Sequence, residues 1–295
     1  EATRPVSPHS HCVYFRLNGV TGMVTTLPDL GLGTSNLGIK FGDDHDGPDD
    51  PDECVDAVAA ALDLGYRHIE TAQMYQNEHL VGEAIQRSGV DREEVFLATK
   101  VHPSNLAFDD VIESTRESLS KLRTDYVDLL YVHWPITAYD PEDTLPAFDR
   151  LYDEGTIEHV GVSNFTVETL ERAREILDAP IAANQIQIHP LLPPTEGERA
   201  DVLPYADEHD IDIVAWSPLA RGDALSLGPV QAVAEKHGVS PARVILAWLY
   251  EYDLKLIVKA STQEHLRDNV AARSLELDAE DIDTIESVEE RTRLF

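Results

Sequence analysis

Four side chains capable of acid–base chemistry lie at or just beyond the ends of apolar segments that have the length of β-strands. Glu70 ends one such segment, and the phenol Tyr75 follows five residues later. Lys100 ends a second segment and His133 ends a third. A carboxylate, a phenol, an ammonium group and an imidazole at the ends of separate strands would form a site for proton transfer.

The chemistry of tyrosine explains why these residue types belong together. A free tyrosine has a pKa near 10, so it donates a proton slowly at pH 7 unless a cation stabilises its phenolate. A buried lysine supplies that cation, and a carboxylate partner keeps the lysine charged. Tyr75, Lys100 and Glu70 meet this requirement if the fold brings them together.

From residue 29 onward, eight apolar segments of strand length alternate with segments of helical periodicity. The strands are expected at Leu30–Thr34, Tyr66–Glu70, Val95–Lys100, Val127–His133, Ile157–Val162, Ala182–Ile188, Ile211–Trp216 and Lys255–Ala260.

The first helical segment shows the i, i+3, i+4, i+7 spacing of an amphipathic helix at Val55, Val58, Ala59 and Leu62, and Gly65 follows as a stop signal. Further helices are expected at Asn77–Ser88, Asp109–Leu122, Glu142–Glu154, Val167–Leu177, Glu198–His209, Val230–Tyr252 (divided at Gly238 and Pro241) and Gln263–Ala272. Eight strand–helix units predict an α/β fold, a closed (β/α)8 barrel of parallel strands. Active sites of such barrels lie at the C-terminal ends of the strands, where the four side chains fall.

The chain resembles the aldo-keto reductase family of NAD(P)H-dependent (β/α)8-barrel enzymes from about Leu30 to its C-terminus. The resemblance rests on Gly31-Leu32-Gly33-Thr34, residues 65–78, Thr99-Lys100, His133-Trp134-Pro135, Gly161-Val162-Ser163-Asn164-Phe165, Asn184-Gln185, His189-Pro190, Trp216-Ser217-Pro218-Leu219 and residues 257–269.

The resemblance implies that Tyr75 is the general acid for carbonyl reduction. Lys100 would lower its pKa, Glu70 would hold Lys100, and His133 would orient the carbonyl group. NADPH is the expected cofactor, with NADH also possible. Ser163, Asn164 and Gln185 would bind the carboxamide of the cofactor, and Trp216 would stack on its nicotinamide ring. The other expected cofactor-binding residues are Gly33, Thr34, Ser217, Leu219, Lys259, Ser261, His265 and Asn269. Ser35 and Trp134 would face a small carbonyl substrate.

The chain departs from the family pattern in four places. Glu70 replaces the usual aspartate, and His265 replaces an arginine that contacts the cofactor's 2′-phosphate, so the preference for NADPH is expected to be mild. Ser35 replaces a pocket tryptophan. The chain also ends soon after residue 290, which predicts an open substrate pocket without the long C-terminal loop.

Residues 255–273 add a hint from charge. This segment contains four basic and two acidic residues, whereas the whole chain has a formal net charge of −32. We expect a locally positive spot after the eighth strand, where barrels of this type bind phosphate.

The net charge also bounds the partners and the environment. With 55 acidic and 23 basic residues, the surface is a poor match for nucleic acid or anionic membranes. We interpret it as an adaptation to concentrated salt, which screens self-repulsion. Two cysteines make no disulfide framework, and no apolar run spans a membrane. We therefore expect a cytoplasmic protein, a monomer or weak homo-oligomer, with no bound metal.

Residues 1–22 differ in composition from the rest. They are either a non-native extension ahead of Met23 or a hairpin turning at Asn18-Gly19, and residues 23–295 form a single reductase domain. The segment Gly42–Glu53 is expected to be an acidic loop, because its spacing does not fit a calcium loop.

Two other functions compete with carbonyl reduction. A cofactor-sensing regulatory subunit of the same fold would bind NADPH with negligible turnover. An aldolase would use Lys100 as a Schiff-base nucleophile, but Ser163-Asn164 and the Lys259 region would then have no role.

Overall fold

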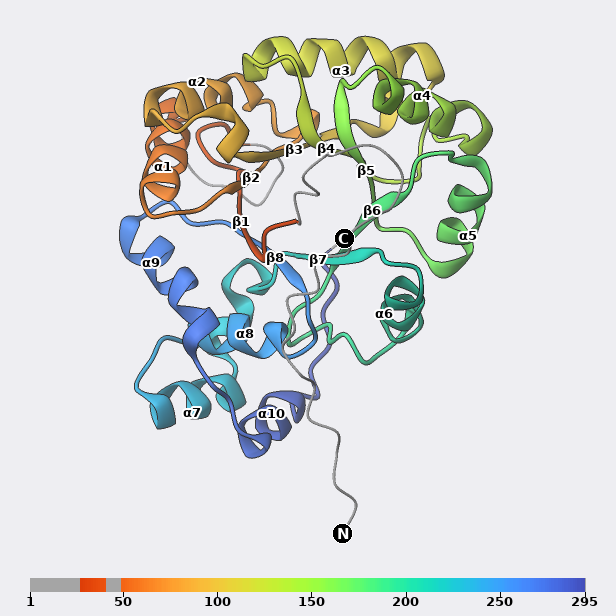
Figure 1. The fold of residues 1–295 in the computed structure, drawn as a ribbon. Coiled ribbons are helices and arrows are strands. Elements are labelled where there is room, and N and C mark those ends of the chain that lie inside the picture. Colours follow the sequence, from red (N-terminus) through yellow and green to blue (C-terminus); the bar gives the residue numbers. More distant parts are fainter. Residues whose placement is uncertain (1–26, 41–48, 295) are drawn as a thin grey trace, which may run out of the picture.

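Eight parallel strands close into a barrel in the order β1 to β8, and helices surround it (Figure 1). The computed structural model describes residues 27–40 and 49–294. The expected extension or hairpin over residues 1–22 and most of the acidic segment lie outside the described residues. The predicted fold class is confirmed.

Each strand pairs in parallel with its sequence neighbours, and β1 pairs with β8 to close the barrel. The strands are β1 (Leu30–Gly33), β2 (His68–Glu70), β3 (Phe96–Val101), β4 (Val127–Val132), β5 (Ile157–Ser163), β6 (Ile181–Gln187), β7 (Asp212–Trp216) and β8 (Lys255–Val258). All eight expected strands are present, with ends that shift by one or two residues.

The helices form the outer ring. They are α1 (Pro51–Asp63), α2 (Glu78–Ser88), α3 (Phe108–Leu122), α4 (Pro141–Asp153), α5 (Val167–Ile176), α6 (Glu198–Glu208), α7 (Gly228–His237), α8 (Pro241–Tyr250), α9 (Gln263–Ala271) and α10 (Ala279–Glu286). Short 3₁₀ helices lie at η1 (Gln73–Tyr75), η2 (Arg92–Glu94), η3 (Pro103–Asn105), η4 (Ala220–Ser226) and η5 (Ala272–Ser274).

Two helices differ from the expectation. The prediction of an acidic loop over Gly42–Glu53 is wrong at its C-terminal end, because α1 begins at Pro51. Proline suits the first helical turn, and Asp52 and Glu53 complement the helix dipole there. The helix α10 was not expected; its capping box at Asp278 and Asp281 is the signal that marks its start.

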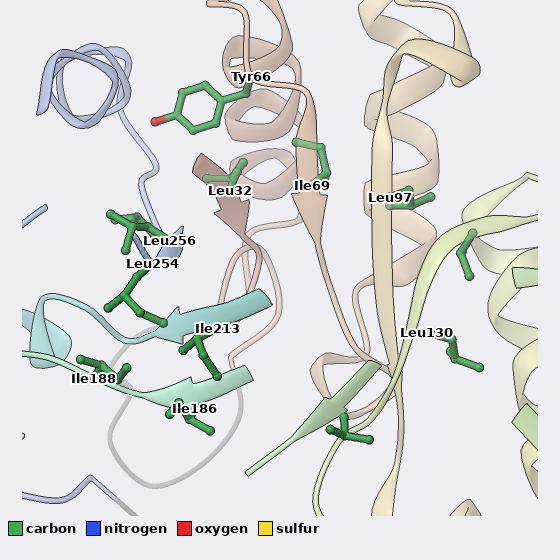
Figure 2. Close-up of a cluster of buried hydrophobic side chains, with 14 of the residues drawn as sticks. Leu32, Tyr66, Ile69, Leu97, Leu130, Ile186, Ile188, Ile213, Leu254 and Leu256 are labelled. Atoms are coloured by element: carbon green, nitrogen blue, oxygen red, sulfur yellow. The ribbon is translucent and has the colours of Figure 1, made fainter. Parts of the chain in front are cut away.

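Alternate residues along each strand face opposite sides of the barrel wall. The outward-facing set packs against the surrounding helices, as Leu32, Ile69, Leu97 and Leu130 show in Figure 2. These four side chains are completely buried. The main hydrophobic core is therefore the layer between the barrel and the helix ring.

A smaller apolar cluster fills the barrel interior. Its members are Leu27, Phe96, Ala98, Leu129, Tyr131, Ala183, Val214 and Ile257. His68 is buried against this cluster, and its ring meets Phe96 edge-on. Burial lowers the pKa of His68 to about 3, so the imidazole is neutral at ordinary pH. Packed side chains therefore fill the barrel interior.

The helix ring is tightly packed between α2 and α3. A Cβ atom at Gly82 would lie 2.6 Å from the backbone of Leu122, so only glycine allows this approach. No helix in the described part of the chain is long and apolar enough to cross a bilayer.

Candidate active site

The inward-facing side chains change character at the C-terminal ends of the strands, where polar groups replace the apolar cluster. Lys100 follows Ala98 along β3, and Glu70 follows His68 along β2. Both side chains are almost completely buried. Because period-2 alternation points them into the barrel, they meet at its mouth.

Lys100 is the centre of this site. Its Nζ forms an ion pair with a carboxylate oxygen of Glu70. The same Nζ donates to the carbonyl oxygen of Thr71 at 3.1 Å and to the hydroxyl of Tyr75 at 3.2 Å. The structure therefore brings together the predicted carboxylate, lysine and tyrosine.

Tyr75 is positioned by the 3₁₀ helix η1, which Gln73 fixes to neighbouring loops. The Oε1 of Gln73 accepts from the backbone N of His102 at 2.8 Å and from Asn105 Nδ2 at 3.1 Å. Gln76, in the left-handed region at φ 57°, ends the turn. Sequence reasoning did not single out Gln73; its position two residues before the phenol is the available signal.

The pKa of Tyr75 reflects its burial. Burial and the nearby negative charge of Glu70 hold the pKa of Tyr75 well above its usual value. Lys100 Nζ lies 3.2 Å from the same hydroxyl and is paired with Glu70. Burial lowers the pKa of Lys100, and Glu70 opposes that shift. Tyr75 thus keeps its proton at neutral pH.

His133 lies beside the phenol, with its ring edge-on to Tyr75 at a centroid distance of 5.8 Å. Burial, followed by the positive charge of Lys100, lowers the pKa of His133 well below 6.5. Its Nδ1 is buried and has no hydrogen-bond partner in the described structure. The neutral imidazole can therefore donate one N–H to a bound acceptor.

A connected polar group lies across the barrel mouth from Tyr75. Asn164 Nδ2 donates to Ser163 Oγ at 2.9 Å and to the carbonyl oxygen of His133 at 3.3 Å, while its Oδ1 accepts from Trp216 Nε1 at 3.1 Å. Ser163 Oγ donates to the carbonyl oxygen of Gln185 at 2.9 Å. Trp216 meets Trp134 edge-on, with centroids 6.2 Å apart. These contacts join predicted site residues into one cluster, which contains His133, Trp134, Ser163, Asn164, Gln185 and Trp216.

Glu70 joins that cluster to the lysine. While one oxygen pairs with Lys100, the other accepts from Gln185 Nε2 at 3.1 Å. This contact was not predicted from the sequence.

The end of β1 forms the next part of the rim. Gly33 and Thr34 are buried, and Ser35 is half-buried. Asn77 fixes this loop: its Nδ2 donates to the carbonyl oxygens of Thr34 at 2.7 Å and Leu37 at 3.0 Å. Asn77 is a buried positioning residue that the sequence analysis named as a helix start and did not assign to the site.

The expected phosphate end lies after β7 and β8. Lys259, Ser261 and His265 are exposed there, and Ser217 and Leu219 are half-buried in the β7 loop. Lys259 forms no ion pair within residues 27–40 and 49–294. Asn269 is buried beside the Tyr66 hydroxyl.

The expected positive spot over residues 255–273 is wrong in part. Lys255 begins β8 and therefore lies at the opposite end of the barrel, where it pairs with Asp29 at 2.8 Å. Arg273 pairs with the same Asp29 at 2.8 Å. Lys259 remains at the expected phosphate end, whereas Arg267 donates to Gln263 on the surface of α9.

These residues fit a nicotinamide cofactor. Trp216 presents a half-exposed ring at the barrel mouth, and amide and hydroxyl groups of Ser163, Asn164 and Gln185 lie around it. Lys259 precedes the N-terminus of α9, and a helix N-terminus favours anions. Desolvation and the neighbouring Lys40 lower the pKa of Lys259, so a bound phosphate would stabilise its charge.

Comparison with known proteins agrees with this geometry. Residues 29–290 match the model of the aldo/keto reductase family. The chain is 39% identical over 271 residues to the methylglyoxal reductase DkgB of Escherichia coli O157:H7, covering 91% of this chain and 95% of that relative. It is 36% identical over 243 residues to the glyoxal reductase of Bacillus subtilis, covering 82% and 86%.

A solved structure agrees as well. The crystal structure of a Gox0644 point mutant in complex with NADPH has a TM-score of 0.76 and 32% sequence identity, covering 88% of this chain and 89% of that one. The chain therefore belongs to the aldo/keto reductase family and is an NAD(P)H-dependent oxidoreductase.

Proposed function

We propose that this enzyme reduces small aldehydes and ketones to alcohols, with Tyr75 as the general acid. The observation that carries the proposal is the 3.2 Å contact between the Tyr75 hydroxyl and the ammonium group of Lys100, beside the neutral imidazole of His133. Such a constellation places a proton donor, a cation and a hydrogen-bond donor around one acceptor oxygen.

The cofactor supplies a hydride when bound, and the protein supplies orientation and electrostatics. Ser163, Asn164 and Gln185 would hold the carboxamide, Trp216 would stack on the nicotinamide, and Lys259 would contact phosphate. Thr34, Ser217, Leu219, Ser261, His265 and Asn269 are proposed to complete that site.

The proton then moves at a defined atom. The substrate oxygen would accept hydrogen bonds from the Tyr75 hydroxyl and a His133 N–H. Tyr75 keeps its proton until negative charge develops on the substrate oxygen, and the proton then moves from the Tyr75 hydroxyl to that oxygen. Lys100 stabilises the resulting phenolate. Glu70 keeps Lys100 charged despite complete burial.

The relatives guide the choice of substrate and cofactor. We infer that methylglyoxal and glyoxal are among the substrates, as in the names of the two relatives, and that NADPH is used. Ser35 and Trp134 would line the space for the carbonyl compound. The acidic composition supports activity in concentrated salt.

A spectrophotometric assay tests this function. NADPH oxidation is followed with methylglyoxal, glyoxal and a panel of aldehydes and ketones, in buffers from low to molar potassium chloride. We expect turnover dependent on both substrate and enzyme. Binding of NADPH without turnover on any member of the panel would contradict the proposal and favour the cofactor-sensing alternative.

A further inference from the structure

The residue His102 lies at the barrel mouth and has no role in the proton transfer proposed above. In the register of β3 and β4, which lie side by side (Figure 1), Lys100 pairs with Tyr131, and both side chains face the barrel interior. Two positions further along each strand, the same register brings His102 beside His133. The period-2 alternation of a strand turns these two side chains inward again. His102 is therefore the neighbour of His133 around the barrel wall.

The electrostatics of the site agree with this placement. Burial and the positive charge of Lys100 lower the pKa of His133, and a charge on His102 lowers it further. His133 in turn meets the ring of Tyr75 edge-on, at a centroid distance of 5.8 Å. His102 is half-buried, so a ligand at the barrel mouth can reach its ring. His102 thus belongs to the wall that surrounds the reacting carbonyl group.

The hydrogen bonds of the His102 ring determine which nitrogen carries the proton. Nδ1 accepts from the backbone N of Ser104 at 3.1 Å and lies 2.7 Å from Ser104 Oγ. Because a backbone N–H can only donate, the proton of the neutral ring lies on Nε2. Within residues 27–40 and 49–294, Nε2 has no hydrogen-bond partner. His102 therefore offers one N–H donor to a ligand.

The loop that carries His102 is held from two sides. The backbone N of His102 donates to Gln73 Oε1 at 2.8 Å, and Gln73 begins the 3₁₀ helix η1 that carries Tyr75. The next residue, Pro103, is buried, and its carbonyl oxygen accepts from the backbone N of Ala138 at 3.1 Å. One side-chain amide, that of Gln73, therefore links the backbone at His102 to the helix of the proposed general acid.

We propose that His102 Nε2 donates a hydrogen bond to a second oxygen of the substrate, on the carbon atom next to the carbonyl group. Neighbouring strands are roughly 4.8 Å apart, so donors from His133 and His102 suit two oxygens on adjacent carbon atoms. His102 is then a specificity-determining residue that favours 2-hydroxy and 2-oxo carbonyl compounds over simple aldehydes and ketones. This inference rests on the proposed reductase function, and its test separates the two.

The test compares glycolaldehyde with propanal, in which a methyl group replaces the hydroxyl group. We would measure kcat/KM for both with wild type, His102→Asn and His102→Gln. Asparagine can still accept from the backbone N of Ser104, because its Oδ1 takes the place of Nδ1, but it lacks the distal donor. Glutamine places an amide N–H near the position of Nε2. His209→Asn is the matched control, since His209 is half-buried between α6 and β7 at the opposite end of the barrel.

We expect His102→Asn to lower kcat/KM for glycolaldehyde by about fivefold, mainly through KM, because one neutral hydrogen bond is lost. Propanal should change by less than about twofold, since it lacks the second oxygen. His102→Gln should keep most of the preference for glycolaldehyde, and His209→Asn should change neither substrate. If His102 only caps η3, the order reverses: His102→Asn is harmless and His102→Gln slows both substrates equally. That result, or a glycolaldehyde-to-propanal ratio that is the same in wild type and His102→Asn, would overturn the proposal.

A binding measurement separates this inference from the reductase function. Hydroxyacetone and butan-2-one differ by the same replacement of a hydroxyl by a methyl group, and calorimetry with NADP⁺ present would give their Kd values for wild type and His102→Asn. If no carbonyl compound is reduced, but hydroxyacetone binds more tightly than butan-2-one only when His102 is present, the reductase proposal fails and the hydrogen bond stands. If the Kd ratio of the two ketones is the same in wild type and His102→Asn, the inference is overturned whatever the turnover.

Discussion

Glu70 accepts a hydrogen bond from Gln185 across the barrel mouth, with 3.1 Å between Oε2 and Nε2, while its other oxygen pairs with Lys100. One carboxylate therefore connects the proposed proton donor to the proposed carboxamide site. Glutamate has one methylene more than the aspartate typical of the resembled family, and the longer side chain reaches both partners. In this chain the glutamate contacts Gln185 and also pairs with Lys100.

The two roles of Glu70 predict different results for two substitutions. Glu70→Gln removes the charge that balances Lys100, which is completely buried. We expect kcat to fall by at least tenfold, because an uncompensated buried ammonium group is strongly unfavourable. Glu70→Asp keeps the charge and is expected to stay within a few-fold of wild type, with the contact to Gln185 weakened. Steady-state kinetics of both variants check this, and wild-type kcat for Glu70→Gln would show that the carboxylate does not support Lys100.

The pKa shifts predict a pH profile that falls on the basic side only. Burial lowers the pKa of Lys100 from its usual 10.5, so kcat/KM should fall as the pH rises through a value below 10.5. Tyr75 has a pKa well above 10 and keeps its proton over this range. Because the pKa of His133 lies well below 6.5, its imidazole stays neutral as the pH falls through 6.5.

The measurement is kcat/KM from about pH 5 to 11, a range that includes the ordinary pKa values of histidine, about 6.5, and lysine, about 10.5. The decay of NADPH is subtracted, and folding is checked at each pH. A loss of activity centred near pH 6.5 in the folded enzyme would mean that His133 titrates normally and is not buried as described.

His265 predicts a mild preference for NADPH over NADH. His265 is exposed in the first turn of α9, which follows Lys259 in the sequence. An imidazole cannot donate two parallel hydrogen bonds to a phosphate, as a guanidinium group does. His265→Arg should raise the NADPH-to-NADH ratio of kcat/KM by about tenfold. Arg267→Gln is the control, since Arg267 donates to Gln263 and should not affect the ratio. An unchanged ratio for His265→Arg would place residue 265 away from the 2′-phosphate.

The acidic composition predicts that stability rises with salt. The formal net charge is −32, and the Debye length shortens to roughly 3 Å at 1 M, so added salt screens the self-repulsion of the folded state. Circular dichroism melting curves across a potassium chloride series would measure this. Sucrose at equal osmolality controls for general exclusion effects. A melting temperature that is the same at low and molar salt would contradict the halophilic interpretation.

The sequence predicted the barrel well because each strand and helix carries a strong periodic signal. Strand ends shifted by a residue or two, and the helix α10 was missed because its short amphipathic segment follows the expected last unit. Alternation along β2 and β3 also placed Glu70 and Lys100 inside the barrel, since inward direction follows from strand period alone.

Long-range pairings were less predictable. Lys255 looked like part of a phosphate site because it lies four residues before Lys259, yet a strand of that length separates the two ends of the barrel. Glu70 and Gln185 are 115 positions apart in the sequence, so no local sequence pattern predicts their contact.

The central claim is that Tyr75 donates the proton, and the most direct test is kcat of Tyr75→Phe on the best substrate, measured together with the Kd of NADPH. Tyr131→Phe is the matched control, because Tyr131 is a second buried phenol inside the barrel and has no hydrogen-bond partner in the described structure. We predict that Tyr75→Phe lowers kcat by about 10²–10⁴-fold and leaves NADPH binding unchanged, while Tyr131→Phe retains turnover. Turnover by Tyr75→Phe within a few-fold of wild type would contradict the account.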